Sequence, residues 1–385
     1  MKKLIFLALA ALMMNACQGT VDPDQENPKD NTEQEGPSDD KQDPNEDTSD
    51  LEGAITLYAE RDVIKADGAY SSKLSVILLD RHGEQHDVTE DVEIYYEGSD
   101  APLTSSDFKT DKEGEYVLYA MRGFDISNSV TVKAVNGVPE FPEDQDAANT
   151  AFAHRMLLLQ HTGNECPNCP RLMDVLKRLS ENETYKDLYY HVASHSYNES
   201  DAAYSSAAQT LSKAMNLTRN YPMLTYNLTT EDGFNEDEIK ETILALHKDK
   251  AEVGIAASSA VEGGKVRVNI NIKSAVDSKY RVAVWVLEDN IHSPQSGANA
   301  SWQNMHSNCL RYMYGNEKTE CIYGKTLGLV KAGESKDMIA AFDLDPEWVS
   351  ENCKLMIIAV SANADYSLAN CTYCPIEGSV SYDYL

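Results

Sequence analysis

The sequence predicts a multidomain α+β protein, in which β-sandwich regions flank a central α/β domain. Residues 51–138 and 251–385 alternate apolar and polar side chains at period two, which is typical of half-buried strands. Residues 150–250 instead combine short apolar runs with helical spacing. More than 300 residues follow the polar N-terminal region, and a single hydrophobic core rarely serves so long a chain.

Residues 1–17 have the pattern of a lipoprotein signal peptide. A short positive start precedes an apolar run at residues 4–14, which is too short to span a bilayer. Ala16 and Cys17 resemble a lipobox, and this resemblance implies that Cys17 is lipidated and anchors the chain to a lipid membrane. The alternative is an ordinary secretory signal with an incidental cysteine. No later segment is long and apolar enough to predict a transmembrane span.

Residues 18–50 are predicted to be an acidic disordered tether. They contain 12 acidic residues and two lysines, and they bury too little apolar surface to offset chain entropy. Asp22, Asp24 and Glu26 loosely resemble acidic tags that direct lipoproteins to the cell exterior. We therefore expect an outer-membrane, lipid-anchored and surface-exposed protein, with a plain solvated linker as the alternative. The net charge of −30 argues against nucleic acid as a partner.

Residues 51–138 are predicted to form a small β-sandwich. Alternating strands are expected at residues 54–58, 73–79, 92–96, 115–121 and 130–135. The region lacks cysteine and resembles the immunoglobulin-like modules that serve as stalks in bacterial surface proteins. This resemblance implies a spacer, and ligand binding is the alternative.

Residues 150–250 carry a CxxC motif between a buried strand and a helix. The strand is expected at residues 155–161, and Leu172, Val175, Leu176 and Leu179 then recur at helical spacing. A strand at 189–194, a second helix, Tyr221-Pro222, a strand at 223–228 and a last helix follow. This order resembles the thioredoxin-like domain, although only one strand is evident after Pro222, where thioredoxins have a hairpin.

The expected chemistry of the motif is thiol–disulfide exchange. A helix N-terminus stabilises a thiolate, so Cys166 is expected to attack a substrate disulfide and Cys169 to resolve the mixed disulfide. Pro222, if cis, would complete the catalytic set. Tyr221, Pro167 and Asn168 are the expected contacts for a protein or peptide substrate, and the pattern requires no cofactor.

Two alternatives for the motif remain open. An exported CxxC can be a structural staple that never turns over. A zinc or copper site could combine Cys166 and Cys169 with His161 and His195. We favour the dithiol and predict no metal.

A more specific resemblance covers residues 150–385. Gln160-His161-Thr162-Gly163 followed by Cys166-Pro167-Asn168-Cys169-Pro170 resembles the opening "F-T-G-x-x-C-x-N-C-P" of the outer-membrane-protein-28-related lipoproteins, with His161 in the place of Phe. A short polar stretch that ends in Leu-Arg also resembles this family: Trp302, Asn304, His306, Asn308, Leu310 and Arg311. The resemblance implies an outer-membrane location more firmly than an activity.

Residues 251–385 are predicted to form a second β-sandwich, with strands at 265–272, 280–287, 338–344 and 354–361. Its cysteines are Cys309, Cys321, Cys353, Cys371 and Cys374, whose connectivity the sequence leaves open. Cys371 and Cys374 are expected to be structural, and a pair that exchanges with Cys166 is the alternative.

Three functions are compatible with these observations. The first is a surface thiol–disulfide oxidoreductase or isomerase. The second is a non-catalytic binding or adhesion protein with a thioredoxin-like scaffold, and the third is a metal-handling lipoprotein. A thioredoxin-like fold alone does not establish an enzyme, because function belongs to sites and not to folds.

Overall fold

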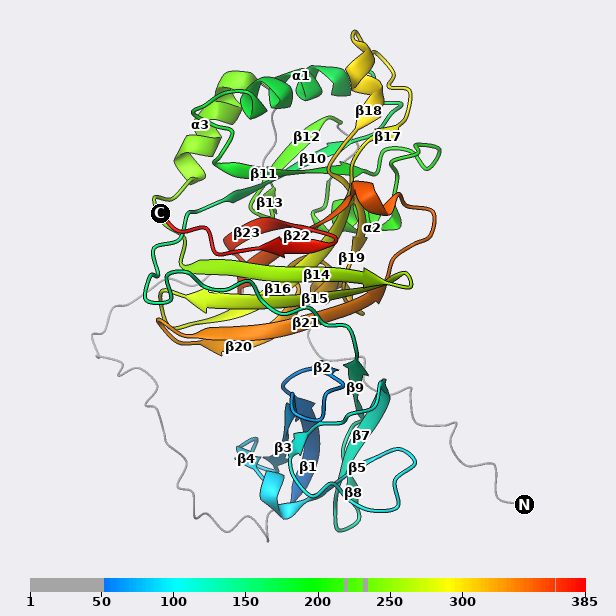
Figure 1. The fold of residues 1–385 in the computed structure, drawn as a ribbon, viewed down its shortest axis with the longest axis vertical. Helices are drawn as coiled ribbons and strands as arrows, with labels where there is room; N and C mark the ends of the chain where they lie inside the picture. Colours follow the sequence, from blue (N-terminus) through cyan, green and yellow to red (C-terminus); the bar gives the residue numbers. More distant parts are fainter. Residues whose placement is uncertain (1–51, 218–220, 231–234, 364) are drawn as a thin grey trace, which may run out of the picture. The chain divides into compact units, whose positions relative to one another are not determined.

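The computed structural model describes residues 52–217, 221–230, 235–363 and 365–385 (Figure 1). The predicted signal peptide, Cys17 and the tether lie outside the described residues. The described chain is rich in β-structure and contains several sheets, as the sequence predicts. Within these ranges no helix has the length and apolar character needed to cross a membrane.

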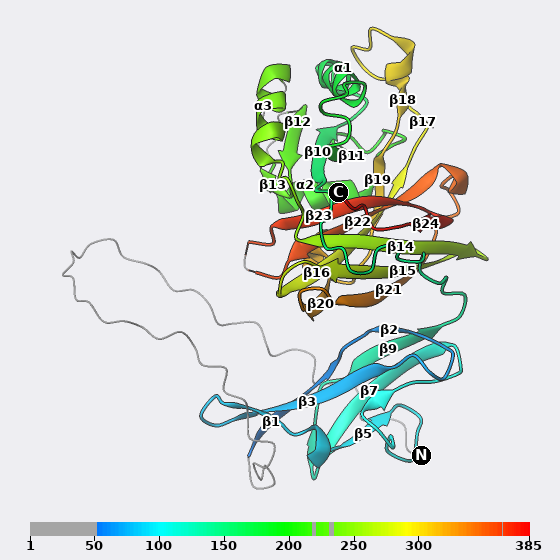
Figure 2. The same cartoon turned by 60° about the vertical axis from the view of Figure 1, so that its left-hand side comes forward.

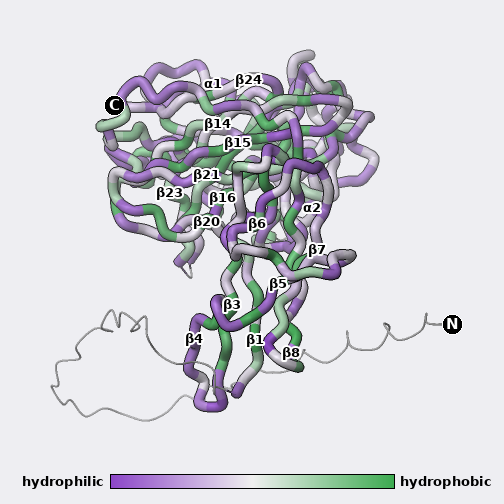
Figure 3. The backbone as a smooth tube through the Cα atoms, turned by 60° about the horizontal axis from the view of Figure 1, so that its bottom comes forward, coloured by the Kyte–Doolittle hydropathy of each residue, from purple (hydrophilic) through white to green (hydrophobic). Residues whose placement is uncertain are grey.

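Residues 53–135 form two sheets around one core, which includes Leu57, Val76 and Leu118. One sheet contains β1 (Gly53–Ala59), β3 (Ser72–Asp80), β4 (Gln85–Asp87) and β6 (Asp107–Phe108). The other contains β2 (Val63–Lys65), β5 (Glu93–Tyr96), β7 (Gly114–Arg122), β8 (Asp125–Ile126) and β9 (Val130–Val135). In Figure 3, hydrophobic stretches follow β1 and β3, whereas the β4 hairpin is hydrophilic. The five predicted strands are confirmed, and the short β2, β4, β6 and β8 were not predicted.

The central region is built on β10 (Met156–Thr162), in which every residue is buried. This strand pairs in parallel with β11 (Tyr189–His195) and antiparallel with β12 (Met223–Tyr226). Side chains alternate along a strand, so Met156 and Leu158 pack with α1 (Cys169–Ser180) and α3 (Glu236–Leu246). Leu157 and Leu159 face α2 (Ser206–Ala214) on the opposite side (Figures 1 and 2).

The expected absence of a hairpin after Pro222 is wrong. β12 turns at Asn227 and Leu228, which have φ of 52° and 66°, into β13 (Thr229–Thr230). A strand of two residues is too short to produce a visible alternating pattern, so the sequence did not reveal it. The predicted last helix is confirmed, and its N-cap Asn235 accepts a hydrogen bond from the amide of Asp237.

The strands of residues 251–385 form two layers. β21 (Ser335–Asp343), β15 (Lys265–Ser274), β14 (Val253–Glu262) and β24 (Gly378–Val380) make a four-stranded sheet. Its Val268 and Ile270 pack against Val284 and Ile357 of the other layer. That layer contains β16 (Ser278–Glu288), β19 (Cys309–Met313), β20 (Lys325–Val330), β22 (Cys353–Ser361) and β23 (Leu368–Pro375).

The second layer continues into the central region. β19 pairs in parallel with β11 through Ala193 and Cys309, so β10–β13 belong to the same nine-stranded sheet as β16 and β19. Strands on both sides of the predicted boundary at residue 250 therefore share one sheet. This continuity brings the segment between β16 and β19 to the loop that carries the CxxC motif.

Candidate functional site

The CxxC motif lies where β10 ends and α1 begins. Cys166 and Cys169 are joined by a disulfide bond. The helix starts at Cys169, with Asn168 as its N-cap, so Cys166 precedes the helix and Cys169 occupies its first position. The strand–CxxC–helix order predicted from the sequence is confirmed. The helix N-terminus was expected to stabilise a Cys166 thiolate, but the helix begins three residues after Cys166.

Both cysteines are buried, so Cys166, the cysteine expected to attack a substrate disulfide, is not open to the solvent. Cys166 is 2% exposed and Cys169 is fully buried, whereas the intervening Pro167 and Asn168 are exposed. Only these two residues of the motif are therefore open to a substrate in this conformation. Their exposure is compatible with the predicted substrate contacts.

Tyr221, predicted to contact a substrate, and Pro222, predicted to complete the catalytic set, lie immediately before β12. Tyr221 and Pro222 are joined by a cis peptide bond, and Pro222 is buried. His161 pairs with Met223 across the β10–β12 ladder, so Pro222 lies beside the end of β10, from which the CxxC loop departs. The hydroxyl of Tyr221 lies 2.9 Å from that of Ser196, which follows β11.

A segment distant in sequence packs on the CxxC loop. The side-chain amide of Gln295 donates hydrogen bonds to the carbonyls of Gly163, Asn164 and Cys166 at 3.3, 3.1 and 2.9 Å. At Gly297 the backbone has φ of +73°, and a Cβ atom would lie 2.4 Å from the carbonyl oxygen of Pro167. Residues 295–297, here called the clasp, therefore fit against the motif with no space for a larger side chain at position 297.

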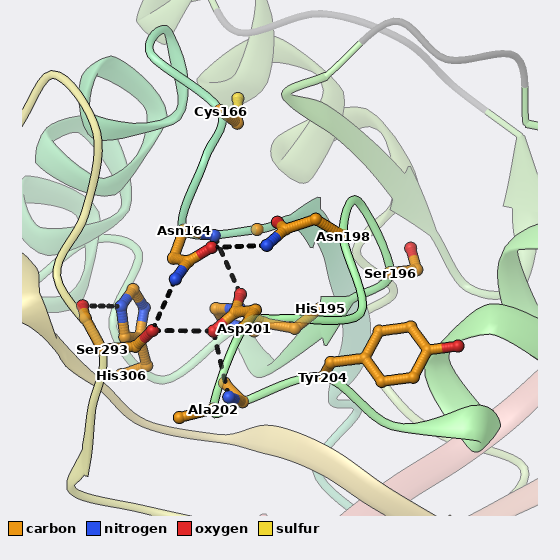
Figure 4. A network of polar contacts seen from close by, with 12 residues as sticks. Asn164, Cys166, His195, Ser196, Asn198, Asp201, Ala202, Tyr204, Ser293 and His306 are labelled. Atoms are coloured by element: carbon orange, nitrogen blue, oxygen red, sulfur yellow. Dashed lines mark hydrogen bonds and ion pairs between the residues drawn. The ribbon is translucent and has the colours of Figure 1, made fainter.

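A buried carboxylate fixes the base of the same loop (Figure 4). One Asp201 oxygen accepts from the backbone amide of Asn164 at 2.8 Å and from Nδ1 of His195 at 2.7 Å. The other accepts from the hydroxyl of Ser293 at 2.9 Å. Burial disfavours the charged carboxylate, but the hydrogen bond from His195 and the backbone amides outweigh it and lower the pKa of Asp201 below its ordinary value.

The polar stretch at residues 302–311 also converges on this region. The His306 ring packs edge-on against that of His195, with centroids 4.7 Å apart, and its Nε2 lies 3.0 Å from the carbonyl of Ser293. The side-chain amide nitrogen of Asn308 lies 3.2 Å from Nδ1 of His191. Asp201, Ser293 and Gln295 were missed by sequence reasoning, whereas His306 and Asn308 were noted only through the family resemblance.

The histidines of the alternative metal site are not brought together with the cysteines. His161 points to the α2 side of the sheet, where Nε2 lies 3.1 Å from the hydroxyl of Thr225. Burial lowers its pKa to about 3. His195 instead binds Asp201. Among the described residues, the group with metal-ligand geometry is Asp80, Glu84 and His86, which includes neither the cysteines nor these histidines.

The remaining cysteines of the described chain, Cys309, Cys321, Cys353, Cys371 and Cys374, are free thiols. Cys371 and Cys374 both lie within β23. Residues three apart in a strand face opposite sides; accordingly, Cys371 packs in the core with α2 and Cys374 in the core of the two-layer region. They form neither a structural bond with each other nor an exposed pair for exchange with Cys166.

Comparisons with known proteins give only remote similarity. No family model and no curated protein matches the chain. A solved structure described as HBP35 of Porphyromonas gingivalis is similar over 59% of this chain and 77% of its own, with 16% identity and a TM-score of 0.48. A domain of the outer membrane lipoprotein Omp28 from Porphyromonas gingivalis covers 33% of this chain and 89% of its own, with 19% identity and a TM-score of 0.23. Similarity at this level carries no argument about function.

Proposed function

We propose that the protein is an outer-membrane, cell-surface lipoprotein anchored through Cys17, whose thioredoxin-like domain at residues 150–250 exchanges disulfides with protein or peptide thiols. The order β10, CxxC, α1, β11, α2, β12, β13, α3 supports this proposal. The observation that carries it is the Cys166–Cys169 disulfide at the junction of a buried strand and a helix N-terminus.

The proposed exchange begins from the disulfide. A substrate thiolate attacks the sulfur of Cys166, forms a mixed disulfide and releases Cys169 as a thiolate, which the N-terminus of α1 stabilises. A second substrate thiolate then attacks the substrate sulfur and releases Cys166. The substrate loses two electrons and gains a disulfide, while the pair gains these electrons and takes up two protons.

The decisive measurement is the equilibrium reduction potential of the Cys166–Cys169 pair in the mature protein. Glutathione buffers would set the redox state, and mass spectrometry after alkylation would report it. A potential above about −250 mV, with selective modification of Cys166, is expected for an exchangeable pair, whereas one below about −300 mV marks a structural bond and contradicts the proposal.

A second candidate is a non-catalytic binding or adhesion protein that uses the same domain as a scaffold. The burial of both cysteines beneath the clasp favours it. This function predicts that Cys166→Ser retains partner binding, and a low potential combined with retained binding would support the scaffold over the exchange enzyme.

The membrane anchor has a separate test. A Cys17→Ser variant should not incorporate a labelled fatty acid and should be released from the membrane fraction, whereas the wild-type chain should remain bound. Protease accessibility on intact cells would then report surface exposure. A labelled or membrane-bound Cys17→Ser variant would contradict anchoring through Cys17.

A further inference from the structure

A cavity of about 340 Å³ lies beside the CxxC region, on the α1 side of the sheet. Its floor is formed by β10 and β11, and its walls by α1 and by residues 302–308. The floor residues are buried, apart from the half-buried His191, whereas Lys177, Trp302, Met305 and Ser307 at the margin are exposed. Neither cysteine of the motif lines the cavity, so it is separate from the exchange site proposed above.

Within the part of the chain that the structure describes, three polar side chains of the floor have atoms without a hydrogen-bond partner. These atoms are Nε2 of Gln160, Oγ1 of Thr162 and Oη of Tyr189, and the residues are 4%, 2% and 7% exposed. Alternation along the parallel pair β10 and β11 directs all three to the α1 face. Burying polar atoms without partners costs stability, so a cluster of them around one cavity indicates groups that a ligand satisfies.

The unpartnered atoms are mainly hydrogen-bond donors. Burial raises the pKa of Tyr189 to about 12, so its hydroxyl keeps its proton. Nδ1 of His191 accepts from Asn308, and its Nε2 therefore donates to Oε1 of Gln160. The Gln160 amide is held in place by this bond, with its N–H groups left to donate.

Acceptors lie at the neighbouring histidines. Nε2 of His306 donates to the Ser293 carbonyl, which leaves Nδ1 with a lone pair. Burial, followed by the nearby His195, lowers the pKa of His306 to about 4, so the ring is neutral at pH 7. Nδ1 of His195 is directed to Asp201, which leaves its Nε2 for other contacts.

The charge of the lining restricts the ligand further. None of the residues that line the cavity is acidic. Lys177 at the margin forms an ion pair with Glu181 and lies over the Trp302 ring, 5.7 Å from its centroid. The wall also contains apolar side chains, including Met173, Leu176 and Met305, beside the uncharged polar Ser180, Ser307 and Asn308. A charged ligand buried in this cavity would find no free side chain of opposite charge. The lining therefore disfavours the binding of charged ligands.

We propose that this cavity binds a small uncharged organic molecule, with an apolar or aromatic body and a carboxamide-like group that accepts hydrogen bonds from Gln160 and Tyr189 and donates to a histidine. The volume lies at the lower end of the range of small-molecule sites. The proposal goes beyond disulfide exchange and does not depend on it.

Four probes that share one benzene ring test the proposal on the full mature chain: benzamide, benzoate, benzylamine and toluene. Saturation-transfer NMR titrations would measure the affinity of each. Benzamide is expected to bind at least about 5-fold more tightly than the others, because it alone is neutral and has both an acceptor and a donor. Tighter binding of benzoate or benzylamine, or no saturable binding of benzamide, would overturn the proposal.

Tyr189→Phe separates binding from structure. The variant should weaken benzamide binding about 5- to 10-fold through the lost donor. Its urea midpoint should stay the same or rise, because an unpartnered buried hydroxyl has been removed. Tyr190→Phe, one residue along and on the opposite face of β11, is the matched control and should leave benzamide binding unchanged. Unchanged binding by Tyr189→Phe, or equal losses in both variants, would contradict the assignment.

Discussion

Asp201 links the loop before the CxxC motif to the loop after β16. Its carboxylate receives hydrogen bonds from His195, Asn164 and Ser293. Asp201→Asn should lower the free energy of unfolding by about 2–3 kcal/mol at pH 7, because a buried charged acceptor is lost. Urea titrations would measure this, with the exposed Asp187→Asn as the control.

The effect of Asp201→Asn should depend on pH. The folded-state pKa of Asp201 lies below the ordinary value of 3.8, so its contribution is complete above that value and is lost as the pH falls through the folded-state pKa. The stability difference between wild type and variant should therefore shrink below about pH 4. A difference that grows on acidification would contradict the role given to the carboxylate.

Gln295 is the residue whose side chain holds the clasp to the motif. Gln295→Ala removes the donor shared by three loop carbonyls, and we expect the clasp to open more often. Dithiothreitol should then reduce the Cys166–Cys169 bond about 5- to 10-fold faster, a change that corresponds to about one hydrogen bond. Gln209→Ala, on α2, is the control. An unchanged rate would show that the clasp does not limit access.

Sequence alone identified the cysteine pair and Pro222 but not what surrounds them. The motif is local, so spacing reveals it. Asp201 and Gln295 act through contacts across 37 to 132 residues of sequence, which no periodicity encodes. The hydrogen bond from Gln295 to the Cys166 carbonyl is of the same kind, because it joins residues 129 positions apart.

At the scale of elements, the N-terminus of α2 connects the central region to β19. Ser205 caps the helix by accepting from the amide of Ala208 at 3.0 Å, and its hydroxyl donates to the carbonyl of Leu310. Ser205→Ala should cost about 1–2 kcal/mol, whereas Ser206→Ala, the exposed neighbour, should cost much less. Equal costs in chemical denaturation would contradict the capping role.

Long strands were predictable because their alternation extends over many residues. β15 and β22 match their expected ranges within two residues at each end. Strands of two or three residues, such as β8 and β13, contain too few positions to define a period. The position of β23 was hidden because the strand is buried on both faces and the polar Asn370 and Thr372 lie among its buried residues, so apolar and polar residues do not mark an inner and an outer face.

At the scale of the whole molecule, the central region shares its core with the strands that follow. Leu159 and Leu211 pack in one cluster with Trp285 and Ile358. A fragment of residues 150–250 should therefore fail to unfold cooperatively, whereas residues 150–385 should do so in one transition. Circular dichroism during urea titration would compare the fragments, and a cooperative transition in the shorter fragment would contradict this coupling.

The buried free thiols determine what happens to the protein when it unfolds. Burial raises the pKa of Cys353 and Cys374 to about 12, and the pKa values of Cys309 and Cys371 are also raised. These sulfurs are thus inert only while the fold is intact. Once unfolding exposes them, each becomes a nucleophile toward the Cys166–Cys169 bond, and a reshuffled chain refolds only after the native disulfide has formed again, which is slow. The lifetime of the functional protein would then be set by its rate of unfolding, so a slow unfolding rate would matter more than a large free energy of unfolding.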